Sequence, residues 1–313
     1  MKILIVGSTP QTAGIGGVAI HVERLLDALK HRSVDVVHED YKKSALRPFL
    51  KCITADVVHI HSQNKMYSFL LALFAELCHA KVVYTLHQKY VVGNSFECKL
   101  CNWLFMVCDI IITLNTQSKD DIRKILGIDT VLLPAFIPPT HTEPLNDDIL
   151  NLIKRGKQCN RKLCVTNAAY YSVSSIGETY GISFLVKYFS KHPNCFLIVS
   201  DPSGQNKVNI SCEADNIAFI TYKHSFYEIL KRADIFIRHT NTDGDALSVK
   251  ESLSLGVCTL CTDVVDRPEE AILFKYENEE SLSTALSKVN NADRKVSVFS
   301  NLVDDLIKLY GIN

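Results

Sequence analysis

Two carboxylates flank a run of small residues in the second half of the chain. Asp243 is followed by Gly-Asp-Ala-Leu-Ser-Val-Lys and then by Glu251, and the apolar segment 233–237 precedes them. This order predicts a strand, a loop and a helix. Ionised carboxylates accept hydrogen bonds from vicinal hydroxyls, and a helix start attracts phosphate. The plain alternative is a helix with an Asp near its start and a Glu that points into water.

A glycine-rich loop follows the first predicted strand. It runs from Gly7 to Gly17, ends in the pair Gly16-Gly17 and leads into a helical pattern from Val18. Flexible glycines at a helix start suit a phosphate or a closely approaching sugar. The loop is too long for the Gly-x-Gly-x-x-Gly fingerprint, which disfavours an NAD enzyme. An ordinary connecting loop is the alternative.

Histidines end two of the predicted strands. His59 and His61 close one strand, and His87 closes the next in Tyr-Thr-Leu-His. Their rings could therefore lie at the edge of a sheet, where we expect one of them to contact a ligand. A lone histidine at a strand end is more often a structural residue.

Together these segments resemble the retaining GT-B glycosyltransferases of family four. In that family a strand leads into Glu-Gly-Phe-Gly-Leu, then Glu, Ala and a Gly-Pro-Val-Val strand; here the first Glu is Asp243, and Gly256 precedes the final strand. The resemblance implies that Asp243 holds hydroxyls of the donor sugar and that Glu251 holds the nucleotide ribose. It also implies that the amides of residues 245–247 face the diphosphate.

Two bases of the family pattern are missing from this chain. Members carry an Arg early in the second domain and a Lys before a Gly, yet here Tyr180 precedes Gly181. We expect Arg238, at the end of its strand, to replace them, because a guanidinium reaches two phosphate oxygens. Lys250 and Arg267 are weaker candidates.

The resemblance completes the set of expected site residues. His87 matches a family histidine that contacts the donor sugar or acceptor near the reacting carbon, so we expect it to be catalytic together with Asp243 and Glu251. Gly16 and Gly17 match a glycine pair beside the donor sugar. The residues expected to bind the donor are Gly16, Gly17, Arg238, Asp245, Ala246, Leu247 and Lys250.

We expect no metal ion and no cofactor other than the nucleotide-sugar, which is a co-substrate. The order Asp243-Gly-Asp245 is similar to the Asp-x-Asp metal site of the other major glycosyltransferase fold, but here it lies before a helix in the second half of the chain. A four-thiolate zinc site would need the pairs Cys98–Cys101 and Cys258–Cys261 together. Side chains three apart in a strand point to opposite faces, so Cys258 and Cys261 are interpreted as small apolar residues.

Short, β-branched apolar runs alternate with helical patterns in both halves of the chain. Ile3–Val6 and Ile110–Thr113 are examples from the first half, and Ile217–Ile220 is one from the second. Such runs are typical of strands buried on both faces of a parallel sheet. We therefore expect an α/β protein of the GT-B fold, with two Rossmann-like doubly wound parallel-sheet domains facing a cleft.

A proline-rich linker, 133–144, separates the two predicted domains. We expect residues 1–146 to form an acceptor-side domain and residues 147–296 to form the nucleotide-sugar-binding domain. For residues 297–313 the resemblance implies a C-terminal helix that packs back onto the first domain.

Composition limits the partners of the chain. Lys plus Arg and Asp plus Glu each total 34 in 313 residues, which gives no support to nucleic acid as a partner. Residues 41–51 mix bases with Leu46, Phe49 and Leu50, which predicts a surface for anionic lipid; a solvated helix face is the alternative.

Eleven cysteines without framework spacing and no signal peptide favour a cytoplasmic protein with reduced thiols.

The resemblance implies a retaining transfer of sugar from a nucleotide-diphosphate donor to a hydroxyl of a lipid-linked oligosaccharide acceptor. By analogy with bacterial relatives, the product belongs to a surface polysaccharide such as lipopolysaccharide or capsule, made at the inner face of the cytoplasmic membrane. A sugar-nucleotide epimerase is one alternative. A catalytically weak nucleotide-binding partner subunit is another, because both expected bases are missing.

Overall fold

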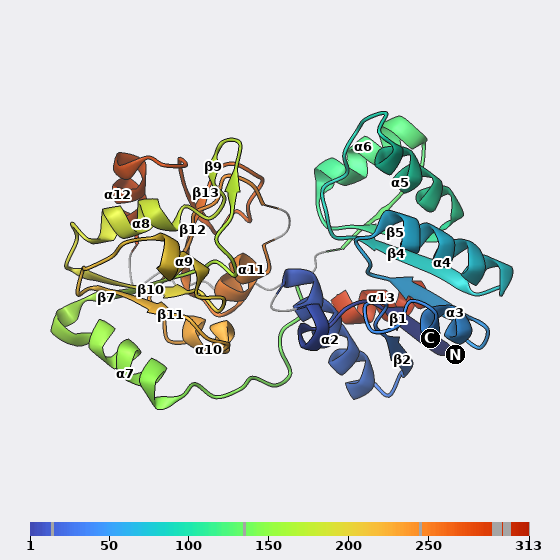
Figure 1. The fold of residues 1–313 in the computed structure, drawn as a ribbon, viewed down its shortest axis with the longest axis horizontal. Helices are drawn as coiled ribbons and strands as arrows, with labels where there is room; N and C mark the ends of the chain where they lie inside the picture. Colours follow the sequence, from blue (N-terminus) through green and yellow to red (C-terminus); the bar gives the residue numbers. More distant parts are fainter. Residues whose placement is uncertain (14–15, 134–135, 244–245, 290–295, 297–301, 313) are drawn as a thin grey trace. The chain divides into compact units, whose positions relative to one another are not determined.

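The computed structural model describes residues 1–13, 16–133, 136–243, 246–289, 296 and 302–312. The chain divides into two compact units, each with its own sheet (Figure 1). The first unit contains residues 1–140 and 300–313, and the second contains residues 141–299. The last helix therefore belongs to the first unit, although it follows the whole of the second unit in sequence.

The first unit has a six-stranded parallel sheet in the order β2-β1-β3-β4-β5-β6. Its strands are β1 (Lys2–Val6), β2 (Asp35–Glu39), β3 (Val57–Ile60), β4 (Lys81–Leu86), β5 (Ile110–Thr113) and β6 (Val131–Leu132). Its helices are α1 (Pro10–Ala13), α2 (Gly17–His31), α3 (Arg47–Cys52), α4 (Lys65–Leu77), α5 (Phe96–Val107), α6 (Thr116–Leu126) and α13 (Leu302–Tyr310).

Helices cover both faces of this first sheet. Alternate residues of β1 point to opposite faces, so Leu4 packs with α3, α4 and α5, while Ile3 packs with α2 and α13. Figure 1 shows α13 (red) beside α2 and β1 (blue). Burial on both faces explains why β1, β3, β4 and β5 are mostly apolar in sequence.

The second unit repeats this architecture with the strand order β11-β10-β7-β12-β13-β14. Its strands are β7 (Lys162–Asn167), β10 (Cys195–Ser200), β11 (Ile217–Ile220), β12 (Ile235–Arg238), β13 (Cys258–Thr262) and β14 (Ile272–Phe274), with a small hairpin of β8 (Val173–Ser174) and β9 (Gly177–Glu178). Its helices are α7 (Asp147–Gly156), η1 (Gln158–Asn160), α8 (Ile182–Phe189), α9 (Gln205–Asn209), α10 (Phe226–Leu230), α11 (Leu247–Ser254) and α12 (Glu279–Ser287).

Two helical layers also sandwich the second sheet. One core joins α8 and α12 to Leu197 and Ile237, and the other joins α7, α10 and α11 to Phe196 and Phe236. Figure 1 shows α8 and α12 on one side of this sheet and α7 and α10 on the other. The expected α/β class with two doubly wound parallel sheets is confirmed.

Each sheet has a point where the direction of strand order reverses, and ligands of open α/β sheets bind there. In the first unit it lies between β1 and β3, and in the second it lies between β7 and β12. The pairing of β7 with β12 ends at Val165 and Phe236, although both strands continue. Past this pair the backbones of β7 and β12 are no longer paired, and Arg238 follows at the end of β12.

Candidate functional site

Arg238 lies at the switch point of the second sheet. It is the last residue of β12, and its Nη1 lies 3.5 Å from the carbonyl oxygen of Asn167, the last residue of β7. Its guanidinium carbon lies 5.0 Å from the centre of the Tyr180 ring, a cation–π contact. The Tyr180 ring therefore stabilises the charge of Arg238.

Asp243 is bound by two guanidinium groups. Arg238 donates from Nε to Asp243 Oδ2 at 2.9 Å and from Nη2 to Oδ1 at 3.1 Å, a bidentate pair. Arg267, which follows β13, donates from Nη1 to Asp243 Oδ2 at 3.0 Å. The side chains of Asp243, Arg238 and Arg267 are 9%, 10% and 2% exposed, so this cluster is largely withdrawn from water.

The charges of this cluster set its protonation state. Burial alone would raise the pKa of Asp243, but Arg238 and then Arg267 outweigh it and lower that pKa. Burial opposes ionisation of Arg238 as well, yet Asp243 raises the pKa of Arg238 above its ordinary value. Two guanidinium groups and one carboxylate thus carry a net charge of +1, which favours an anionic ligand.

Arg267 has a donor left over for such a ligand. Its Nη2 is buried and has no hydrogen-bond partner among the described residues, while its Nε donates to the carbonyl oxygen of Thr262 at 3.3 Å. Buried donors are rarely left without a partner in native proteins. Sequence reasoning ranked Arg267 below Arg238, and the structure brings both to Asp243.

The contacts of Asp243 bear on its expected role. Three of the roughly four acceptor positions of a carboxylate are occupied by Arg238 and Arg267. Binding of sugar hydroxyls by both carboxylate oxygens of Asp243 would require these bonds to break. The geometry therefore favours Asp243 as the residue that orients the two guanidinium groups.

The helix that follows Asp243 carries the other predicted donor residues. Ala246 is the N-cap of α11, Leu247 is its first residue, and Lys250 lies half-buried one position before Glu251. Glu251 is only 5% exposed, so the alternative of a glutamate that points into water is wrong. Asp245 lies outside the described residues.

A close contact beside Tyr180 fixes the start of α8. Gly181 has φ +48°, and a Cβ atom there would lie 1.8 Å from Nδ1 of His239. His239 stacks between Phe184 and Tyr276, with ring centres 4.7 Å away on each side, and burial lowers its pKa to about 4. The glycine of the Tyr180-Gly181 pair is thus required by packing.

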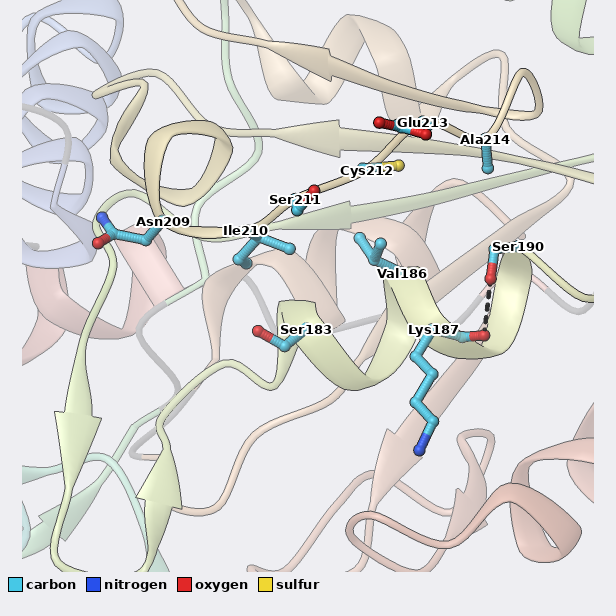
Figure 2. A pocket seen from close by; sticks show the side chains of 10 residues that line it. All are labelled: Ser183, Val186, Lys187, Ser190, Asn209, Ile210, Ser211, Cys212, Glu213 and Ala214. Atoms are coloured by element: carbon cyan, nitrogen blue, oxygen red, sulfur yellow. Dashed lines mark hydrogen bonds between the residues drawn. The ribbon is translucent and has the colours of Figure 1, made fainter.

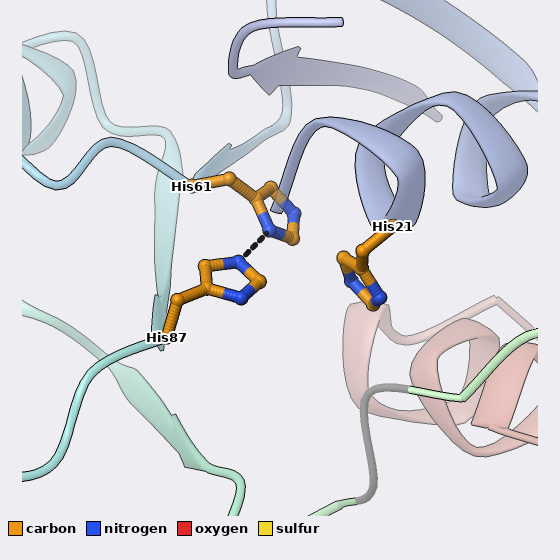
Figure 3. Close-up of side chains that lie close together, drawn as sticks. All are labelled: His21, His61 and His87. Atoms are coloured by element: carbon orange, nitrogen blue, oxygen red, sulfur yellow. Dashed lines mark hydrogen bonds between the residues drawn. The ribbon is translucent and has the colours of Figure 1, made fainter. Parts of the chain in front are cut away.

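In the first unit, the predicted histidines meet at the other switch point (Figure 3). His61 directly follows β3 and His87 directly follows β4, and His61 Nδ1 lies 2.9 Å from His87 Nε2. His21, on α2, completes the group, with its ring centre 5.3 Å from that of His61 and 5.2 Å from that of His87. One ligand nitrogen from each ring lies within 4.8 Å of the others, a grouping that could hold a metal ion.

Burial controls the charge of these rings. It lowers the pKa of His61 and of His87 well below the ordinary value, and neighbouring histidines lower both further. Both rings are therefore neutral at pH 7. Sequence reasoning missed His21, because one histidine within an apolar helix pattern carries no local signal.

His59 has a structural role. Its Nδ1 lies 2.6 Å from the hydroxyl of Tyr310, on α13, and its Nε2 lies 2.7 Å from Oγ1 of Thr85. Burial lowers its pKa to about 3. With both ring nitrogens engaged and the side chain fully buried, His59 is not available to a ligand.

The predicted glycine pair begins α2. Gly16 is its N-cap, with extended backbone angles, and Gly17 is its first residue. No described atom lies within 4 Å of a Cβ added at Gly16 or Gly17. Among the described residues, packing requires glycine at neither position, and the space beside the pair is open to a ligand.

A surface hollow in the second unit lies away from these residues. It has a volume of about 490 Å³ and lies between α8 and the segment after α9 (Figure 2). Its lining residues are Ser183, Val186, Lys187, Ser190, Asn209, Ile210, Ser211, Cys212, Glu213 and Ala214. None of the residues predicted for the donor site lines it.

Neither a protein-family model nor a curated protein sequence matches this chain. Solved structures match over almost its whole length. HepE from Anabaena, in complex with UDP-glucose, has a TM-score of 0.68 at 11% identity, covering 99% of this chain and 95% of HepE. The catalytic domain of starch synthase IV from Arabidopsis thaliana, bound to ADP and acarbose, has a TM-score of 0.67 at 12% identity, covering 99% of this chain and 98% of that one.

A third structure of the same fold is the UDP-GlcNAc 2-epimerase of Methanocaldococcus jannaschii. Its TM-score is 0.65 at 12% identity, and the match covers 100% of both chains. Identities this low show the fold alone. The chain has the GT-B fold that its sequence predicted.

Proposed function

We propose that this protein is a retaining glycosyltransferase that uses a nucleotide-diphosphate sugar. The observation that carries the proposal is the cluster of Arg238, Asp243 and Arg267 at the switch point of the second sheet. It has a net positive charge, two guanidinium groups that Asp243 orients, and one buried donor, Nη2 of Arg267, that has no partner among the described residues. These features suit a diphosphate.

In the proposed reaction, the bond between the anomeric carbon of the sugar and the diphosphate oxygen breaks. A hydroxyl oxygen of the acceptor bonds to that carbon on the same face, and its proton passes to the departing diphosphate. Arg238 and Arg267 stabilise the charge that develops on the leaving group. Asp243 keeps the two guanidinium groups ionised and oriented, and the scheme uses no metal.

The other predicted residues keep the roles that the resemblance implies. Glu251 holds the ribose, and the amides at the start of α11, which have no partner within the helix, face the diphosphate. His87 is neutral at pH 7 and contacts the sugar near the reacting carbon. Gly16 and Gly17 leave room beside the donor sugar.

A lipid-linked saccharide is the acceptor that the surface of the first unit favours. Helix α4 contacts both α3 and α5, and each of these helices exposes large apolar side chains. Among them are Leu46, Leu50, Met66, Leu70, Trp103 and Met106. The same segment of the chain also exposes three bases among Leu46 and Leu50, namely Lys43, Arg47 and Lys51.

We name this surface the α3–α5 face, and we propose that it rests on an anionic membrane. Apolar side chains enter the interfacial region while Lys and Arg contact the lipid headgroups. None of the described helices is long and apolar enough to cross a membrane. The proposed contact is therefore peripheral.

The experiment incubates the full chain with UDP-, GDP-, ADP- and dTDP-sugars in EDTA, with and without membrane lipid extract. Release of nucleoside diphosphate from one donor, increased by lipid, is the expected result. Asp243→Ala and Glu251→Ala should abolish release, whereas Asp215→Ala, a change at an exposed aspartate of the same unit, should not. Equal release by Asp243→Ala and the wild type would contradict the assignment.

An epimerase is the second candidate, because the full-length match to UDP-GlcNAc 2-epimerase covers both chains completely. An epimerase needs no acceptor. NMR of the same mixtures would detect inverted configuration at one carbon of the donor sugar. Such inversion in the absence of acceptor would favour an epimerase over a transferase. Tight nucleotide binding without any turnover would instead indicate a nucleotide-binding subunit.

A further inference from the structure

We propose that His21, His61 and His87 form a binding site for a divalent transition-metal ion of the Zn²⁺ kind. The three rings come from α2 and from the ends of β3 and β4, and Figure 3 shows them facing one another. One nitrogen of each lies within 4.8 Å of the others. Zinc binds histidine at about 2.0–2.1 Å, which places ligand nitrogens about 3.4 Å apart. Small rotations of the rings close this difference.

The surroundings prepare the rings to bind a cation. His61 is 1% exposed, and its Nε2 has no hydrogen-bond partner among the described residues. Neutral imidazole is the form that binds metals, and this unpartnered nitrogen of His61 is available to an ion at the site.

The ligand atoms select the kind of metal. All three are imidazole nitrogens, which suit Zn²⁺, Co²⁺, Ni²⁺ and Cu²⁺, whereas Mg²⁺ and Ca²⁺ prefer oxygen. Three protein ligands leave a fourth position for water or a small anion. The prediction of no metal from the sequence was based on Asp243, Asp245 and the cysteine pairs. This group of histidines was not part of it.

Metal at this place has a consequence for activity that rests on the proposed function. The ion takes a ring nitrogen of His87, the residue proposed to contact the donor sugar. Zn²⁺ should therefore inhibit transfer, and EDTA should restore it. Binding of the metal itself does not depend on the reaction that the protein catalyses.

Untagged full-length protein, stripped with a chelator, is titrated with Co²⁺ and Zn²⁺, with Mg²⁺ for comparison. We expect one equivalent of Co²⁺ with the visible bands of a tetrahedral nitrogen and oxygen site and no thiolate charge-transfer band. His21→Gln and His87→Gln should each weaken binding roughly tenfold or more. His31→Gln, at an exposed histidine of the same helix, should bind as the wild type does.

Unchanged affinity in both variants would overturn the proposal, and so would a thiolate band that Cys98→Ser removes. If a variant fails to fold, X-ray absorption on the metal-loaded wild type counts the imidazole ligands of the ion. Fewer than two imidazole ligands would contradict the proposed site. Where transfer is measurable, His21→Gln should remain active and resist Zn²⁺. If no donor is turned over, the proposed function fails, while the titration still decides the metal site.

Discussion

Arg238 and Tyr180 form a cation–π contact at the switch point of the second sheet. The family pattern has a lysine where this chain has Tyr180, and the Tyr180 ring instead lies 5.0 Å from the Arg238 guanidinium carbon. A guanidinium stacks on an aromatic face and still presents its fork, which an ammonium does not. In the proposed site, the cation therefore comes from the end of β12.

Asp243 should matter for stability as well as for ligand binding. In Asp243→Asn, Arg238 and Arg267 lose their counter-charge while they stay buried, so we expect the free energy of unfolding of the second unit to fall by about 3 kcal/mol at pH 7. Because folding lowers the pKa of Asp243, this contribution is present above about pH 4 and is lost as pH falls through the folded-state pKa.

Hydrogen exchange of the second unit measures this effect between pH 7 and pH 3. The difference between wild type and Asp243→Asn should shrink as the pH falls below about 4. Asp215→Asn, at an exposed carboxylate, serves as the control. A variant as stable as the wild type at pH 7 would show that the ion pairs contribute nothing.

At the scale of elements, the sequence was informative wherever a strand is buried on both faces. β5 and β11 have the predicted bounds, because apolar β-branched runs have few other stable environments. β2, with the sequence Asp-Val-Val-His-Glu, was not predicted, because it lies at the sheet edge and is only partly buried. β6 has only two residues and gives too short a pattern to detect.

The candidate site was predictable only where its residues are neighbours in the chain. Arg238 and Asp243 lie on one strand-to-loop segment, so one pattern includes both. Arg267 reaches Asp243 from the loop after β13, and His21 reaches His87 from α2. These contacts depend on strand order, which a single sequence does not specify.

Helix α8 should not tolerate a side chain at its N-cap. In Gly181→Ala the new Cβ would lie 1.8 Å from Nδ1 of His239 at a φ of +48°, so we expect a loss of about 2 kcal/mol or more. Circular dichroism should show an earlier thermal transition. Fluorescence of Trp103, the single tryptophan, reports the first unit and should not change. Gly204→Ala, with a Cβ in ordinary contact, should be milder.

The α3–α5 face should determine binding to lipid vesicles. Leu50→Glu and Trp103→Glu place charge in the interfacial region, so we expect each to reduce flotation with anionic vesicles by roughly tenfold. Val208→Glu changes a side chain that is 85% exposed in the second unit and serves as the control. Equal binding of all three variants would contradict a specific face.

At the scale of the whole molecule, the chain returns to its first unit after completing the second. α13 packs in the core with β1 and α2, and Tyr310 bonds to His59 beneath the histidine group. Tyr310→Phe leaves a buried ring nitrogen without its partner, so we expect the first unit to lose about 1–2 kcal/mol. Urea unfolding followed by Trp103 fluorescence measures this loss, with Tyr170→Phe, in the second unit, as the control. A midpoint equal to that of the wild type would show that this bond does not stabilise the unit.

We propose that Arg238 and Arg267 bind the diphosphate of a nucleotide. Calorimetric titration of the full chain with UDP, GDP, ADP and dTDP, each beside its monophosphate, tests it most directly. We expect one diphosphate to bind about tenfold or more tightly than its monophosphate, and Arg238→Lys and Arg267→Lys to remove most of that difference, since lysine keeps the charge but loses the fork. Arg155→Lys, at an exposed arginine of α7, should preserve it. Equal affinity for diphosphate and monophosphate in the wild type, or a preference unchanged by both substitutions, would contradict the claim.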